Sequence, residues 1–168
     1  DVGLDTGPMF AMKKIRIRRD DTAGSVFQTL STLGANLLIE TLPDYLSGTL
    51  TPTPQPDEGA TYAPMLKKQD GLLDFTRPAV ELERRVRAMN PWPGAWIEWN
   101  GNVLKVLRAS VVSEAKGLSI GIRFTFEGRP AIMSADGALV LEEVQPAGKK
   151  AMPGKSFLSG ARDWEEHL

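Results

Sequence analysis

The chain has 168 residues, of which 42% are apolar and 24% are charged, and its formal net charge is −1. This composition can bury an ordinary core and excludes intrinsic disorder, and the near-neutral charge excludes general polyelectrolyte binding. The length suits one domain plus a substantial piece of another. Because cysteine is absent, disulfides, thiolate zinc sites and a cysteine nucleophile are excluded. We expect a protein of a reducing cytosol without a metal site.

No run of about 18 apolar residues and no basic leader before an apolar stretch occurs in the sequence. The sequence therefore predicts neither a membrane span nor a signal peptide. Asp1 has no methionine before it, and the first seven residues already resemble the end of a strand that enters a glycine-rich turn. We interpret the chain as truncated at its start.

The first part of the chain predicts one strand and one helix. From Met9 to Arg19 the residues alternate with a period of two, which is typical of a strand with one solvated face. A helix is predicted over 22–47, with Thr22 as its N-cap. Its apolar face comprises Val26, Leu30, Leu33 and Leu37. Residues 51–62 are rich in proline, glycine and threonine, and this composition predicts an extended linker.

A second helix is predicted after Thr76, which can serve as its N-cap. Its apolar stripe comprises Ala79, Leu82, Val86 and Met89. On the opposite side, Glu81 with Arg85 and Glu83 with Arg87 have the i,i+4 spacing of ion pairs. The helix must end before Pro91, because the run Asn90-Pro91-Trp92-Pro93-Gly94 cannot continue it.

The remainder of the chain predicts short strands. They cover Ala95–Trp99, Val103–Val112, the alternating residues 120–126 and Ala138–Val144, with turns at Asn100-Gly101 and Asp136-Gly137. Strand register over 117–130 stays open. Many short strands favour a small barrel, and residues 153–168 predict a helix that covers one of its ends through Phe157, Leu158, Ala161 and Trp164.

One turn near the start is a candidate catalytic site. The run Gly3-Leu4-Asp5-Thr6-Gly7 places a carboxylate between two glycines, so the backbone can approach a ligand closely. For the turn considered alone a structural role is favoured, because Asp5 can satisfy the amides of its own turn. The turn by itself therefore does not establish a catalytic site.

Four stretches together resemble the methionyl-tRNA formyltransferase family. They are residues 1–9 (DVGLDTGPM), residues 90–96 (NPWPGAW), Asn100-Gly101 followed by Leu104-Lys105-Val106, and residues 145–152 (QPAGKKAM). Their order and spacing match as well, and the last stretch is specific, since other folate-dependent formyltransferases share the turn with Asp5 but not this tail. The resemblance covers nearly the whole chain.

The resemblance implies an α+β protein. Residues 1–50 would be the closing strand and helix of a Rossmann-like formyltransferase domain, and residues 51–62 a linker. Residues 63–168 would form an OB-like small β-barrel with flanking helices that binds tRNA. It also implies transfer of a formyl group from 10-formyltetrahydrofolate to the amino group of initiator methionyl-tRNA, in the bacterial cytoplasm or in an organelle.

By the same resemblance Asp5 matches the catalytic aspartate of the family, with Gly3 and Leu4 beside it in the substrate-binding turn. The family's catalytic asparagine and histidine have no counterpart, and the sole histidine, His167, lies in the tail. We therefore expect the chain alone to be inactive.

The expected tRNA contacts are basic, because recognition of the RNA backbone is largely electrostatic. Lys149 and Lys150 are the first candidates, and Lys67 and Lys68 in the linker region are weaker ones. An ordinary solvated loop is the alternative for these lysines. Trp92 and Trp96 could stack on bases, but a packing role in the proline corner is favoured.

Two other functions remain open. The chain could be a nonenzymatic RNA-binding module, or it could belong to another folate-dependent formyltransferase or hydrolase of the same superfamily. A strand and helix without sheet partners would also expose apolar residues such as Val26, Phe27 and Leu30. Homodimerisation of the truncated chain through that surface is a further hypothesis.

Overall fold

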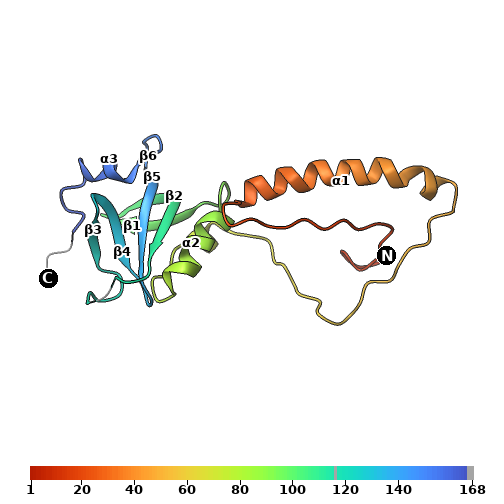
Figure 1. The fold of residues 1–168 in the computed structure, drawn as a ribbon, viewed down its shortest axis with the longest axis horizontal. Helices are drawn as coiled ribbons and strands as arrows, with labels where there is room; N and C mark the ends of the chain where they lie inside the picture. Colours follow the sequence, from red (N-terminus) through yellow and green to blue (C-terminus); the bar gives the residue numbers. More distant parts are fainter. Residues whose placement is uncertain (116, 166–168) are drawn as a thin grey trace. The chain divides into compact units, whose positions relative to one another are not determined.

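The computed structural model describes residues 1–115 and 117–165, so the prediction for His167 lies outside the described residues. The chain divides into two compact units, a first unit of Asp1–Met65 and a second unit of Leu66–Leu168 (Figure 1). The division falls just after the predicted linker. Contacts define these units, whereas their assignment to a catalytic and a tRNA-binding domain stays a prediction.

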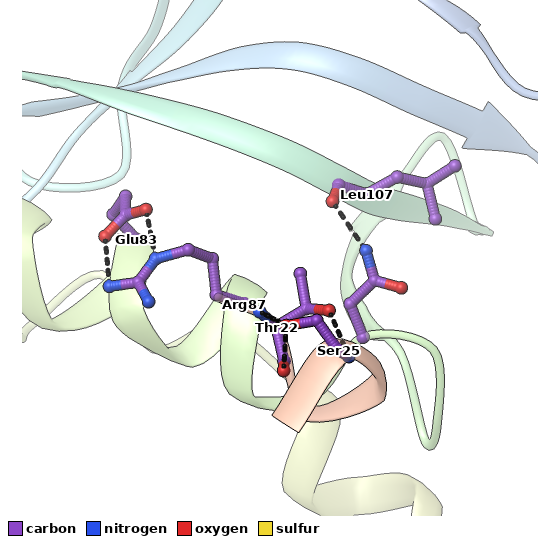
Figure 2. Close-up of polar contacts among 6 residues, drawn as sticks. Thr22, Ser25, Glu83, Arg87 and Leu107 are labelled. Atoms are coloured by element: carbon purple, nitrogen blue, oxygen red, sulfur yellow. Dashed lines mark hydrogen bonds and ion pairs between the residues drawn. The ribbon is translucent and has the colours of Figure 1, made fainter. Parts of the chain in front are cut away.

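The first unit is built on the helix α1, Ala23–Leu46. Its N-terminus carries a capping box, in which the Thr22 hydroxyl accepts from the Ser25 amide and the Ser25 hydroxyl accepts from the Thr22 amide (Figure 2). These bonds satisfy amides that have no partner inside the helix. The predicted helix and its N-cap are confirmed.

The predicted strand from Met9 to Arg19 is wrong. Residues 11–18 are extended but pair with no strand in the described chain, and Met9 alone forms a bridge, with Thr53. The segment instead runs along α1, where Phe10 stacks edge-on with Tyr45 and Lys13 forms an ion pair with Glu40. Alternation of side chains can be read from sequence, but a strand also needs a neighbouring backbone to bond with.

The second unit contains a six-stranded sheet, a short 3-10 helix and two α-helices. In chain order they are η1 (Lys68–Gly71), α2 (Ala79–Ala88), β1 (Ala95–Trp99), β2 (Asn102–Val112), β3 (Arg123–Phe126), β4 (Arg129–Met133), β5 (Ala138–Pro146), β6 (Met152–Pro153) and α3 (Gly154–Leu158). The sheet order is β1-β2-β5-β4-β3, with β6 paired to β5, and every strand pair is antiparallel.

The predicted hairpin of β1 and β2 is confirmed. Trp99 pairs with Asn102 across the turn, and the two turn residues have positive φ angles of 51° at Asn100 and 69° at Gly101. That combination matches the twist of the strands in a two-residue hairpin. The turn before β5, predicted at Asp136-Gly137, is also present, with Gly137 at a φ of 75°.

The core of the second unit lies between the sheet and its helices. The apolar stripe of α2 is buried as predicted, with Ala79 and Leu82 at 0% exposure. The core cluster comprises Leu73, Leu82, Val86, Met89, Ala95, Ile97, Leu104, Val106, Ile132, Leu139, Leu141, Val144, Phe157, Ala161 and Trp164. Residues between Leu73 and Trp164 thus form one contiguous core.

The predicted helix over 153–168 is much shorter in the structure. Helix α3 ends at Leu158, because the chain turns at Ser159 and Gly160. This turn lets Trp164 enter the core, where it is 1% exposed and its indole nitrogen donates to the carbonyl of Phe124 at 3.0 Å. Of the four residues expected to cover one end of a barrel, Phe157, Ala161 and Trp164 belong to the core and Leu158 is partly buried against it, while the barrel itself stays a prediction.

Two details at α2 differ from prediction. Thr76 is not the N-cap, because its hydroxyl and amide both donate to Asp74, and the helix begins after Pro78. The Glu81–Arg85 pair is absent, since Glu81 pairs with Arg77 and the Arg85 guanidinium donates to the carbonyl of Asp70.

The second predicted ion pair of α2 is present. Two nitrogens of Arg87 donate to the two carboxylate oxygens of Glu83, at 2.7 and 3.1 Å (Figure 2). Both side chains are partly buried. The spacing therefore predicted the Glu83–Arg87 pair correctly.

The open register over 117–130 is settled by a hairpin. A turn at Ile120 and Gly121 delays the start of β3 until Arg123, and β3 then pairs with β4, a strand that the sequence pattern did not predict. Ile120 is consequently 53% exposed. Within the described residues, no helix is long and apolar enough to cross a bilayer. No group of three or more metal-ligating side chains occurs there either.

The buried stripe of α2 generates a stability prediction. Leu82→Ala leaves a cavity at a fully buried position and should lower the free energy of unfolding by about 2–5 kcal/mol. Val80→Ala, at a position of the same helix that is 43% exposed, is the matched control and should change it by roughly 0.5 kcal/mol or less. All four tryptophans lie in the second unit, so denaturation followed by tryptophan fluorescence measures this unit. Equal effects of the two substitutions would contradict the assigned core.

A second prediction concerns Asp74. The hydroxyl of Thr76 donates to its carboxylate at 2.6 Å and the Thr76 amide at 3.0 Å, and these bonds hold the pKa of Asp74 below its ordinary value of 3.8. Because the folded pKa is depressed, the stabilising contribution is present above pH 3.8 and is lost as the pH falls through the folded pKa.

Thr76→Val removes the hydroxyl, so the pKa of Asp74 should rise toward 3.8. An NMR titration of the Asp74 carboxyl carbon measures this shift. Thr125→Val, an exposed threonine of β3, should leave the titration unchanged. An unaltered pKa in the Thr76 variant would rule out the hydroxyl as its main cause.

Candidate functional site

In the turn from Gly3 to Gly7, at the start of the first unit, residues 3–6 are exposed and Gly7 is half-buried. Asp5 has a φ of 57°, in the left-handed region, which aspartate tolerates better than most side chains. Gly3 leaves room for Thr6, because a Cβ atom on Gly3 would lie 2.8 Å from the Thr6 hydroxyl. Leu4 is 96% exposed. The turn therefore presents the Asp5 carboxylate and an apolar side chain to the outside.

Hydrogen bonds from the linker hold this turn. The side-chain nitrogen of Gln55 donates to the carbonyl of Asp5 at 2.8 Å and to the carbonyl of Gly7 at 2.6 Å. Met9 and Thr53 exchange two backbone hydrogen bonds of 2.7 and 2.8 Å. Sequence reasoning missed Gln55, since its partners lie 48 and 50 residues away. The alternation of prolines around Thr53 and Gln55 was the available signal.

Lys67 and Lys68 begin the second unit with exposed side chains. The Lys67 amide donates to the carboxylate of Asp70 at 2.7 Å, and the carbonyl of Lys68 accepts from the indole nitrogen of Trp96 at 3.1 Å. Trp96 therefore has the structural role expected of it, whereas Trp92 is 56% exposed and is not a core residue. The backbone is anchored, and both lysine side chains remain available.

Lys149 and Lys150 lie in the turn between β5 and β6, with exposed side chains. The Lys149 amide donates to the carbonyl of Pro146 and its carbonyl accepts from Gln145, both at 3.0 Å. Gly148 has a φ of 72°, which a residue with a side chain would adopt at a cost. The turn has a defined conformation that holds both lysines outward.

The strand register joins these positions into one row on the outer face of the sheet. Trp96 of β1 lies opposite Lys105 of β2, and Lys105 lies opposite Gln145 of β5. Residues directly opposite one another project to the same face. The Lys68 carbonyl accepts from the Trp96 indole nitrogen and the Lys149 carbonyl accepts from the Gln145 side-chain nitrogen, so the backbones of Lys68 and Lys149 lie beside the two ends of the row. We call Lys68, Trp96, Lys105, Gln145 and Lys149 the basic row.

Lys105 is a candidate that sequence reasoning missed, because a single exposed lysine in a strand has no distinctive pattern. It lines a surface hollow of about 240 Å³ together with Val103, Gln145, Pro146, Ala147 and Gly148. Glu98 is the one acidic residue of the β1–β2 hairpin, and it lies opposite Val103. Lys105 and Lys149 line neighbouring surface hollows that share Val103, Pro146 and Ala147, and the Lys68 backbone is bonded to Trp96 in the next strand, while Asp5 belongs to the other unit.

Comparison with known proteins identifies the family to which this chain belongs. Residues 65–162 match the family described as formyl transferase, C-terminal domain. The chain therefore belongs to the formyl transferase family.

The curated relatives are more specific. The chain is 47% identical over 163 residues to a methionyl-tRNA formyltransferase of Myxococcus xanthus, with 95% of this chain and 51% of the relative covered. For a methionyl-tRNA formyltransferase of Roseiflexus sp. the identity is 38% over 163 residues, with 96% and 50% covered. The chain spans about half the length of the curated relatives it matches. Within the family it is thus similar to methionyl-tRNA formyltransferases over nearly all of its residues.

Solved structures support the fold. A variant of HypX from Aquifex aeolicus superposes with a TM-score of 0.67 at 19% identity, covering 99% of this chain and 31% of that one. An N-formyltransferase from Helicobacter canadensis, solved with folinic acid and dTDP-3-aminofucose, gives a TM-score of 0.64 at 18% identity, covering 87% and 52%. The combination of helix and antiparallel sheet is therefore one that formyltransferase structures share.

Proposed function

We propose that this chain is the C-terminal part of an enzyme that transfers a formyl group from 10-formyltetrahydrofolate to the amino group of initiator methionyl-tRNA in the bacterial cytoplasm. The 47% identity to a methionyl-tRNA formyltransferase over 95% of the chain is the observation that carries this proposal. In it, residues 1–50 close a Rossmann-like catalytic domain and residues 63–168 form an OB-like tRNA-binding barrel. A six-stranded antiparallel sheet packed around a single core supports the assignment of the second part to a small β-domain.

The lack of a core in the first unit supports its assignment to a larger domain. None of residues 1–65, all of which are described, is buried. Phe27 is 76% exposed, Ile39 71% and Leu46 74%, which leaves a long apolar surface on one helix. The relatives are about twice as long as this chain. We therefore propose that the remainder of the catalytic domain packs on the exposed apolar surface of α1. Pairing of two chains through the same surface remains the prediction made from sequence.

In this proposal the turn at Asp5 forms one edge of a folate site. HypX from Aquifex aeolicus has been solved with tetrahydrofolic acid and the Helicobacter canadensis enzyme with folinic acid, so folates bind proteins of this fold. In this chain the exposed Leu4 side chain and the Gly3 backbone fit contact with an apolar ring system beside Asp5. When bound, 10-formyltetrahydrofolate would supply the formyl group.

Asp5 is the proposed catalytic group. Its carboxylate is exposed at the turn. Among the described residues, the backbone carbonyl of Asp5, and not its carboxylate, accepts the hydrogen bond from Gln55. A carboxylate in this position can orient a neighbouring histidine or water and accept a proton as the substrate amine loses one. Because the only histidine of the sequence is His167, partners outside this chain would complete the site, and the chain alone would not formylate.

The basic row, with Lys67 and Lys150 beside its ends, is the proposed tRNA contact. Strands in a sheet lie about 4.8 Å apart, so the row spans three strands and roughly 10 Å before the flanking lysines are added. That spacing suits contact with successive phosphates, which fix position without reading sequence. Trp96, beside Lys105 in the row, is partly exposed. Binding of RNA without catalysis is the second candidate function for the chain in isolation.

The first test is formylation by a full-length protein that carries this chain as its C-terminal half. It should formylate methionyl-tRNA, and Asp5→Ala should reduce kcat by at least roughly two orders of magnitude, the usual scale for a proton-handling group. Asp20→Ala, an exposed aspartate in the same unit, is the matched control and should keep full activity. Formylation is followed with radiolabelled formyl donor.

Residues 1–168 alone should show no turnover in the same assay. A full-length protein that formylates an amino sugar but not methionyl-tRNA would instead favour another enzyme of the superfamily. Full activity of Asp5→Ala would overturn the catalytic assignment.

The second test concerns the basic row. Lys105→Ala with Lys149→Ala should weaken tRNA binding and reduce the slope of log K against log salt by about 1.5, since each phosphate contact contributes roughly 0.7–0.9. The pair Lys149→Ala with Lys150→Ala should act similarly. Affinities are measured by fluorescence titration at several salt concentrations.

Lys155→Ala with Arg162→Ala removes the same charge from exposed positions outside the row and serves as the control. If it flattens the salt slope as much as the row variants, the row has no special part in binding.

A further inference from the structure

We propose that Gln55 is a positioning residue for the catalytic turn, and that it holds the Asp5 carboxylate in place by binding the backbone on both sides of it. This inference rests on the proposed function of Asp5. It assigns a specific task to a residue of the linker, which by composition alone would be a passive connection.

The sequence around Gln55 is suited to this task. Pro52, Pro54 and Pro56 alternate with Thr53 and Gln55. Proline fixes its own φ and drives the preceding residue into an extended conformation, so five consecutive residues are held extended without a partner strand. Side chains two residues apart in an extended chain project to the same side. Thr53 and Gln55 therefore act on the same neighbouring segment.

The register places Gln55 at the turn. Met9 and Thr53 form an antiparallel bridge with two backbone hydrogen bonds. In an antiparallel pair, two residues before Met9 lie opposite two residues after Thr53, which puts Gly7 opposite Gln55. The bridge thus delivers the Gln55 side chain to the turn.

Both N–H donors of the Gln55 side-chain amide have an acceptor in the turn. The side-chain amide of glutamine has two N–H donors on one nitrogen. In Gln55 this nitrogen lies 2.8 Å from the carbonyl oxygen of Asp5 and 2.6 Å from that of Gly7. Both carbonyls are acceptors only, so the amide orientation follows without ambiguity. The Gln55 side chain therefore holds the peptide groups after Asp5 and after Gly7, on the two sides of Thr6.

This arrangement bears on the position of the carboxylate. Asp5 adopts a φ of 57°, a conformation that persists when its surroundings hold it. A turn freed at both carbonyls can return to the commoner region of φ, which redirects the Asp5 side chain. Displacements of about 1 Å at a catalytic group can cost roughly a hundredfold in rate. Loss of the two bonds should therefore lower the rate without removing any group that touches substrate.

The test uses the full-length protein with Gln55→Met, which keeps the length of the side chain and removes both donors. We expect kcat to fall about tenfold or more, with KM for the formyl donor and for methionyl-tRNA within about twofold of the parent. Gln55→Glu, which lacks both donors at neutral pH, should behave similarly, and Gln55→Asn should recover part of the rate if it reaches one carbonyl. Gln69→Ala, at an exposed glutamine of the second unit, is the matched control.

Hydrogen exchange gives a readout that does not depend on activity. In Gln55→Met, amides in a peptide covering residues 1–10 should exchange faster than in the parent, whereas Gln69→Ala should leave them unchanged. Parental kcat in Gln55→Met together with an inactive Asp5→Ala would overturn the positioning role alone. Parental exchange in residues 1–10 would show that the clamp is absent. If the parent does not formylate methionyl-tRNA, the proposed function fails, and the exchange result still decides whether the clamp exists.

Discussion

Burial of Trp164 is the interaction on which the second unit depends. This residue is 1% exposed, packs edge-on against Phe157 with ring centroids 5.6 Å apart, and lies 6.3 Å from the ring of Trp99. Its indole nitrogen bonds to Phe124 of β3, and its carbonyl accepts from Arg123. The residue thus ties the end of the chain to the first hairpin and to the far edge of the sheet. The sheet that carries the basic row therefore packs against a core in which Trp164 is one of the largest fully buried side chains.

The first unit is stabilised in a different way. It has no buried residue, so local hydrogen bonds define its conformation, at the Thr22 cap, the Met9–Thr53 bridge and the Gln55 clamp. Such bonds contribute about 0.5–1.5 kcal/mol each and cannot replace a core. The turn at Asp5 is held by these local bonds, and the proposed cover over α1 would add the apolar burial that the first unit lacks. Under the proposed function, folding of the catalytic domain and positioning of Asp5 are therefore linked.

Sequence patterns predicted the elements whose determinants are local. The stripe of α2, the cap of α1 and the Asn100-Gly101 hairpin each depend on residues within a few positions of one another. The strand at 9–19, the late start of β3 and the early end of α3 were mispredicted or missed, because each depends on which backbone or core lies nearby. The same distinction applies to the site. Asp5 and Lys149 lie in recognisable motifs, whereas Gln55 and Lys105 gain their significance from partners distant in sequence.

The alternating prolines have one more consequence. In the bridge at Thr53, the N–H and C=O groups of that residue face Met9, so the N–H groups of its two neighbours would point to the opposite side. Those neighbours, Pro52 and Pro54, have none. The outer edge of this extended segment therefore offers no donors to an incoming strand, and strand donors are what edge-to-edge aggregation requires. The segment can pair with Met9 on one side, while its other side offers no N–H donor at Pro52 and Pro54 to a further strand.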